Sequence, residues 1–209
     1  MERLYGNLKM TWFRVILFAV LAGVYTGIVM LIPILKDTSF QDIGIRYEWW
    51  AIFAVLIVVN CKSGREAMLK CFVFFLISQP LVYLVEILFG HLSFDMGWNY
   101  YRSIWFPMTL LTLPGGLIAY FCKKQSVLGG IILGLGNTIQ AVLALAYFGM
   151  AIRSFPHHLL SGLVCVGSII VMSRSIQKEK KNRLISILLP IALTAVLLLL
   201  LKASGRVLF

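Results

Sequence analysis

Residues 69–90 read LKCFVFFLISQPLVYLVEILFG. Between Lys70 and Glu86 this stretch contains no charged side chain. A helix needs about 20 mostly apolar residues to cross the hydrocarbon core of a bilayer. The stretch therefore predicts a transmembrane helix, and the rest of the chain resembles it.

The composition of the whole chain supports this prediction. Of the 209 residues, 60% are apolar and 13% are charged, and the mean hydropathy is +0.92. A soluble domain carries roughly 25% charged residues. We therefore expect an integral membrane protein in contact with the lipid bilayer, with residues 1–209 forming one domain. The four cysteines form no CxxC pair, so neither a disulfide framework nor a zinc site is predicted.

Apolar runs predict an all-α, polytopic bundle of seven transmembrane helices. The second run is the shortest, because its uncharged part covers only 49–60, so a six-span alternative stays open. The predicted spans are 13–35, 46–60, 68–90, 103–122, 127–151, 156–173 and 184–201.

The basic residues predict the orientation of these spans. With seven spans, 13 Lys and Arg residues fall on the side of the N-terminus and six on the other side. Lys and Arg are enriched in cytoplasmic loops. The excess on the side of the N-terminus therefore predicts that the N-terminus is cytoplasmic and the C-terminus external, in a protein of the plasma membrane. The positive charge is spread over four inner loops and forms no single patch, so no nucleic-acid partner is expected.

An unusual outer loop, GHLSFDMGWNYYRSIW at 90–105, separates the third and fourth spans. Tryptophan and tyrosine favour the membrane interface, so one interpretation is an aromatic belt. The other is a site, because Asn99 and Arg102 stand beside Trp98 on the side that also carries all three histidines.

Polar residues within the third span favour a site. Gln79, Tyr83 and Glu86 are four and three residues apart, so they share one face of a helix. Ionisable groups in hydrocarbon persist only where water, a partner or a ligand compensates for their desolvation. We therefore expect an outward-facing cavity, walled by spans three to six, that takes a small polar or cationic solute. The candidate ligand-binding residues are Gln79, Tyr83, Glu86, Trp98, Asn99, Arg102, Asn137, His157 and His158.

Small residues at four-residue spacing predict close helix packing. Ala19, Gly23 and Gly27 lie on the first span, and Gly130 and Gly134 lie on the fifth. Such positions let two backbones approach in lipid. The helix that meets the first span belongs either to this chain or to a partner subunit.

The small residues of the first span, the polar loop after it and the chain length resemble the substrate-binding S-components of energy-coupling-factor transporters. The resemblance implies that Ala19, Gly23 and Gly27 dock on a shared membrane subunit and that loops 37–48 and 91–102 cover the solute. Separately, residues 69–86 are similar to multi-pass membrane proteins of anaerobic Gram-positive bacteria, which implies a plasma-membrane location.

Two other functions stay open. A membrane-embedded enzyme would use Glu86 with a histidine of the sixth span, although no HExxH or GxSxG motif is present. The chain has no metal or cofactor motif, so none is expected, and catalysis is the less favoured interpretation. The other alternative is a non-catalytic accessory membrane subunit.

Overall fold

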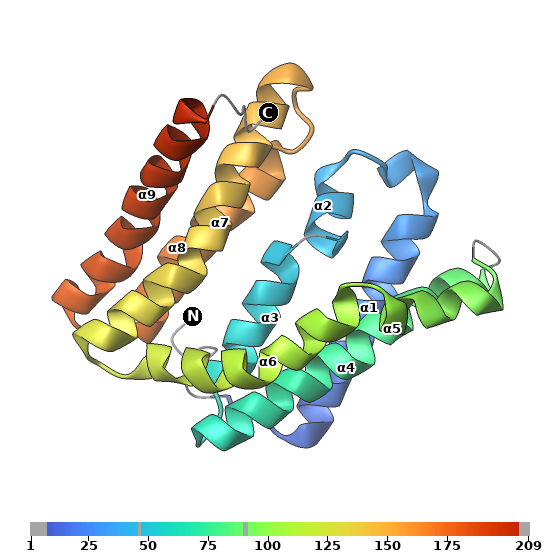
Figure 1. Ribbon diagram of the computed structural model, residues 1–209, viewed down its shortest axis with the longest axis horizontal. Coiled ribbons are helices and arrows are strands. Elements are labelled where there is room, and N and C mark those ends of the chain that lie inside the picture. Colours follow the sequence, from blue (N-terminus) through green and yellow to red (C-terminus); the bar gives the residue numbers. More distant parts are fainter. Residues whose placement is uncertain (1–7, 46, 90–91, 205–209) are drawn as a thin grey trace. The chain divides into compact units, whose positions relative to one another are not determined.

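The computed structural model describes residues 8–45, 47–89 and 92–204 (Figure 1). Within these ranges the chain forms helices and no strand, so the predicted all-α class is confirmed. The elements are α1 (Trp12–Leu31), η1 (Pro33–Leu35), α2 (Ser39–Ile45), α3 (Tyr47–Val59), α4 (Gly64–Leu88), η2 (Phe94–Trp98), α5 (Asn99–Arg102), α6 (Trp105–Ala119), η3 (Tyr120–Lys123), α7 (Val127–Arg153), α8 (Leu159–Ile176) and α9 (Lys180–Ala203).

Among the described residues, six helices are long and apolar enough to cross a membrane, which makes this a multi-pass membrane protein. The remaining predicted span corresponds to α3, whose 13 residues extend about 20 Å. The hydrocarbon core is about 30 Å thick, so α3 by itself is too short to cross it upright. By their contacts, the described residues fall into two compact units, one within residues 7–120 and one within residues 121–209. That the whole chain forms one domain stays a prediction.

In the N-terminal unit (7–120), α1 lies along α4 and runs parallel to it. A Cβ atom on Gly23 would lie 2.6 Å from the main-chain oxygen of Ser78, and one on Gly27 would lie 2.7 Å from Cβ of Val85. Ala19, four residues before Gly23, is also fully buried. The groove that these residues form on α1 is therefore filled by α4 of the same chain, and not by another subunit.

The segment between α1 and α4 brings the chain back to the end where α1 begins. The rings of Tyr25 and Trp49 lie 5.8 Å apart, so α3 starts level with the second half of α1. After α3 ends, the Asn60 side-chain oxygen accepts a hydrogen bond from the main-chain N–H of Leu8, at 2.8 Å. The short α3 therefore runs antiparallel to α1, and this return is what allows α1 and α4 to be parallel.

A buried lysine joins α1 and α4 at the end where both helices begin. Lys70 forms an ion pair with Glu66 one turn earlier and donates a hydrogen bond to the main-chain oxygen of Met10. Its ammonium group also lies 5.5 Å from the centre of the Trp12 ring. A charge in an apolar surrounding requires such partners, so these contacts explain how a lysine is accommodated here. Helix α4 begins at Gly64, four residues before the predicted start of the span, so Glu66 and Lys70 both lie on this helix.

Helix α6 completes the N-terminal unit by packing antiparallel to α4. A Cβ atom on Gly116 would lie 3.1 Å from Cα of Met68, so the end of α6 lies against the start of α4. The Tyr120 hydroxyl donates a hydrogen bond to the main-chain oxygen of Lys62, at 2.7 Å.

In the C-terminal unit (121–209), α7 packs against both α8 and α9 (Figure 1). A Cβ atom on Gly130 would lie 2.8 Å from the main-chain oxygen of Asn182, and one on Gly134 would lie 3.0 Å from Leu189. These glycines therefore allow α7 and α9 to lie close together and parallel. One face of α9 is buried, because its small and polar residues at four-residue spacing meet α7. These residues are Asn182, Ser186, Pro190 and Thr194.

Candidate functional site

A small cavity of about 130 Å³ lies within the N-terminal unit, at the ends of α1 and α4 that are predicted to face outward. It is lined by residues of α1, α2, α3, α4 and α6. These residues are Thr26, Met30, Ile45, Trp50, Gln79, Val82, Tyr83, Glu86 and Trp105.

One side of the cavity is the polar face of α4. Gln79, Tyr83 and Glu86 all line it, as the four- and three-residue spacing of these side chains predicts. All three side chains are half-buried. Within the described part of the chain, the Gln79 amide has no hydrogen-bond partner. The cavity therefore brings together a carboxyl group, an amide and a phenol, which are groups that bind polar or cationic molecules.

The other walls are aromatic and were not predicted as part of the site. Trp50 of α3 is 7% exposed, and Trp105 at the start of α6 is half-buried. Both tryptophans fit the aromatic-belt interpretation in sequence, and no local pattern distinguishes them from the other tryptophans. Only the packing of α3 and α6 against α4 directs them towards Gln79 and Glu86.

The short helix α2 covers the cavity from the loop side. The Thr26 hydroxyl of α1 donates a hydrogen bond to the main-chain oxygen of Gly44, at 2.5 Å, and Ile45 follows directly in the cavity lining. Thr26 lies three residues after Gly23, on the face of α1 that meets α4, so its position was available from the sequence. Of loop 37–48, which the S-component resemblance implies as a cover for the solute, Ile45 lines this cavity, and the side chains of 46–48 lie outside the described residues.

Three of the candidate ligand-binding residues, Trp98, Asn99 and Arg102, do not line this cavity. Trp98 is 56% exposed and lines a separate, mostly apolar groove of about 490 Å³ that also touches the other side of Tyr83. Asn99 is half-buried, and Arg102 is exposed. Asn99 and Arg102 belong to α5 and Trp98 to η2, which precedes it directly, and α5 is held in place by Tyr100. Residues 90 and 91 of this loop lie outside the described residues.

Tyr100 anchors α5. Its side chain is fully buried, and its hydroxyl donates a hydrogen bond to the Thr109 hydroxyl of α6, at 3.0 Å. Burial raises the pKa of the Tyr100 phenol above its usual value of 10, because the charged form would be poorly solvated there. The phenol therefore stays protonated at neutral pH and remains a hydrogen-bond donor.

Spans three to six are predicted to form the walls, and of these α4 and α6 line this cavity. The cavity is enclosed by α1, α2, α3, α4 and α6, because the first and second predicted spans pack on the face of α4 that carries Glu86. The other predicted site residues, Asn137, His157 and His158, belong to the C-terminal unit.

Each of these three residues has its own surroundings in the C-terminal unit. The Asn137 amide donates hydrogen bonds to the Ser173 hydroxyl of α8 and to the main-chain oxygen of Ser186, both at 3.1 Å. His158 is buried, and its ring stacks on Tyr147 with the centroids 6.2 Å apart. His157 is exposed. Asn137 therefore joins three helices, which is a structural role.

No family model, curated protein or solved structure matches this chain. Its function is therefore inferred from the chemistry and the size of the cavity.

Proposed function

We propose that this protein binds a small polar cation in the cavity beside Glu86 and takes part in its passage across the membrane. The observation that carries the proposal is the convergence of Glu86, Gln79 and two tryptophans on one cavity. A carboxylate attracts a cation, and aromatic ring faces attract cations further when water is excluded.

The size of the cavity limits the class of solute. Its volume of about 130 Å³ holds roughly four water molecules, each of which occupies about 30 Å³ in the liquid. Sites for drug-sized ligands measure about 300–1,000 Å³. We therefore favour ammonium or a short alkylammonium ion over a vitamin-sized ligand.

A role like that of the energy-coupling-factor S-components is a more specific form of this proposal. Docking on a shared membrane subunit would then need a surface other than Gly23 and Gly27, because α4 covers these two residues. The exposed face of α1, which includes Phe13 and Leu21, is the surface that remains for such docking.

Thermal unfolding in lipid nanodiscs tests the binding step. Ammonium and methylammonium should raise the melting temperature, whereas the larger choline should not. Glu86→Gln keeps the shape of the side chain and removes its charge. It should weaken binding about 10- to 100-fold, because hydrogen bonds to charged groups contribute about 1.5–3 kcal/mol.

Asp95→Asn is the matched control. Asp95 is an exposed acid on the same predicted side and does not line the cavity, so its substitution should leave binding unchanged. Equal binding by wild type and Glu86→Gln would overturn the proposal. Uptake of ¹⁴C-methylammonium into proteoliposomes then separates the functions. Binding with flux supports transport, binding without flux supports an accessory subunit, and chemical conversion of the solute supports an enzyme.

A further inference from the structure

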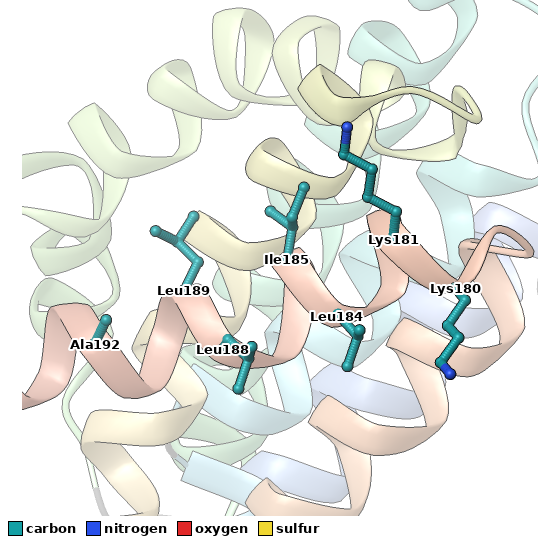
Figure 2. Close-up of a pocket in the computed structure, with 7 residues that line it drawn as sticks. All are labelled: Lys180, Lys181, Leu184, Ile185, Leu188, Leu189 and Ala192. Carbon is teal, nitrogen blue, oxygen red and sulfur yellow. The ribbon is translucent and has the colours of Figure 1, made fainter.

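The first three turns of α9 combine two lysines with an apolar groove (Figure 2). Lys180 and Lys181 stand at one end of this groove, which measures about 760 Å³. Figure 2 shows two rows of side chains that continue from the lysines along the helix. The residues in these rows and at the far end are Leu184, Ile185, Leu188, Leu189 and Ala192.

Among the residues that the structure describes, the two lysines have no counter-charge. Both are exposed, and among the described residues neither forms an ion pair or a hydrogen bond. The adjacent acid, Glu179, accepts a hydrogen bond from the Asn182 amide, at 2.8 Å. Two further basic residues precede the lysines, Arg174 in the last turn of α8 and Lys178 in the loop between α8 and α9, so the local charge is strongly positive.

The other pair of adjacent lysines differs in this respect. The ammonium group of Lys124 lies 4.5 Å from the centre of the Phe121 ring, and Lys123 also has a contact within the protein. Lys180 and Lys181 are therefore the pair that is free to bind an external anion.

The length of the groove matches one leaflet of a membrane. From Lys180 to Ala192 the helix rises about 18 Å, at 1.5 Å per residue. Half of the hydrocarbon core is about 15 Å thick. A group held by the lysines would lie at headgroup depth, and Ala192 would lie near the bilayer midplane. The side chains between them are partly open to the surroundings, with Leu184 44% and Leu188 57% exposed.

We propose that this face of α9 is a binding site for an anionic phospholipid. The lipid phosphate lies between the ammonium groups of Lys180 and Lys181, and one acyl chain lies along the apolar groove as far as Ala192. Charge complementarity selects the headgroup, since basic clusters at the ends of membrane helices attract anionic lipids. This site belongs to the C-terminal unit, and it does not depend on the proposed cation cavity.

Native mass spectrometry of the full-length protein in detergent tests the proposal, with dioleoyl-phosphatidylglycerol and dioleoyl-phosphatidylcholine as probes. The wild-type protein should bind one phosphatidylglycerol more tightly than phosphatidylcholine. The double substitution K180Q/K181Q should raise its Kd roughly 30-fold, because each lysine near the membrane surface contributes about 5-fold. K123Q/K124Q removes the same charge from the same predicted side and should change the Kd less than about 2-fold.

The acyl-chain groove is tested separately. Ala192→Phe fills the far end of the groove and should weaken binding of the dioleoyl lipid but not of dihexanoyl-phosphatidylglycerol, whose chains are too short to reach it. Equal effects of the two double substitutions would overturn the headgroup assignment, because net charge alone would then explain binding. Equal affinity of wild-type protein for the long and short lipids would overturn the groove assignment, even if Ala192→Phe fails to fold. Displacement of the lipid by millimolar inorganic phosphate would show a site for a free anion and would also overturn the proposal.

Discussion

The Asn137 side-chain amide donates a hydrogen bond to the main-chain oxygen of Ser186 across 3.1 Å. In a regular helix this oxygen would accept from the N–H of the residue four positions later, but that residue is Pro190, which has no N–H. Asn137 therefore replaces the hydrogen bond that the proline removes. Its second donor hydrogen bond, to Ser173, connects the same amide to α8.

Asn137→Leu should destabilise the protein by about 2 kcal/mol, because two buried groups lose their donor and interhelical hydrogen bonds in membranes contribute roughly 0.6–1.7 kcal/mol each. Unfolding by SDS in mixed micelles measures this loss. Pro190→Ala returns a helical donor to Ser186, so the double variant should lose less than the sum of the two single variants. Strict additivity would contradict the assigned role of Asn137.

Glycine-to-alanine substitutions on α7 should differ according to what each new Cβ meets. At Gly130 it would lie 2.8 Å from a main-chain oxygen, which cannot move away easily, so Gly130→Ala should destabilise by about 1–3 kcal/mol. At Gly136 it would meet nothing within 4 Å. Gly136→Ala should therefore be neutral or stabilise by up to about 1 kcal/mol through helix propensity. Melting temperatures in detergent compare the two, and equal losses would show that α7 and α9 are not packed through Gly130.

Thr194→Val should stabilise the delipidated protein by about 1 kcal/mol. Thr194 is 5% exposed, lines an apolar cavity of about 460 Å³ between α7, α8 and α9, and its hydroxyl has no hydrogen-bond partner among the described residues. Valine keeps the shape and removes the unpaired group. Thr138→Val is the control and should not stabilise, because the Thr138 hydroxyl bonds to the main-chain oxygen of Gly134, at 2.9 Å. A lower melting temperature for Thr194→Val would mean that this hydroxyl has a partner that the valine loses.

Reporter fusions should place Lys124 and the C-terminal end of the chain on opposite sides of the membrane. Alkaline phosphatase, which is active only outside the cytoplasm, should be active when fused after residue 209 and inactive when fused after Lys124. The physical basis is the excess of basic residues in the predicted inner loops, together with the return of the chain through α3. Activity after Lys124 would contradict the predicted orientation.

Much of the fold follows from the sequence because the signals are local. The lengths of the apolar runs locate the helices, and helical spacing alone places Gln79, Tyr83 and Glu86 on one face. The ends of the helices were predicted less accurately. The first span was predicted to reach residue 35, but α1 ends at Leu31, because Pro33 cannot continue the helical hydrogen bonds.

The partners of each helix face were decided only by the tertiary structure. A small residue on a helix permits close approach of any second helix, so the sequence left open whether Gly23 and Gly27 meet this chain or another subunit. Likewise, a polar face of α4 requires some partner, but its spacing does not say that Trp50 and Trp105 supply the opposite walls. Hydropathy and periodicity describe one helix at a time, whereas the pairing of faces depends on the shapes of all helices together. That pairing places Glu86 beside two tryptophans. It also places the Asn137 amide beside the main-chain oxygen of Ser186, to which Pro190 cannot donate a hydrogen bond.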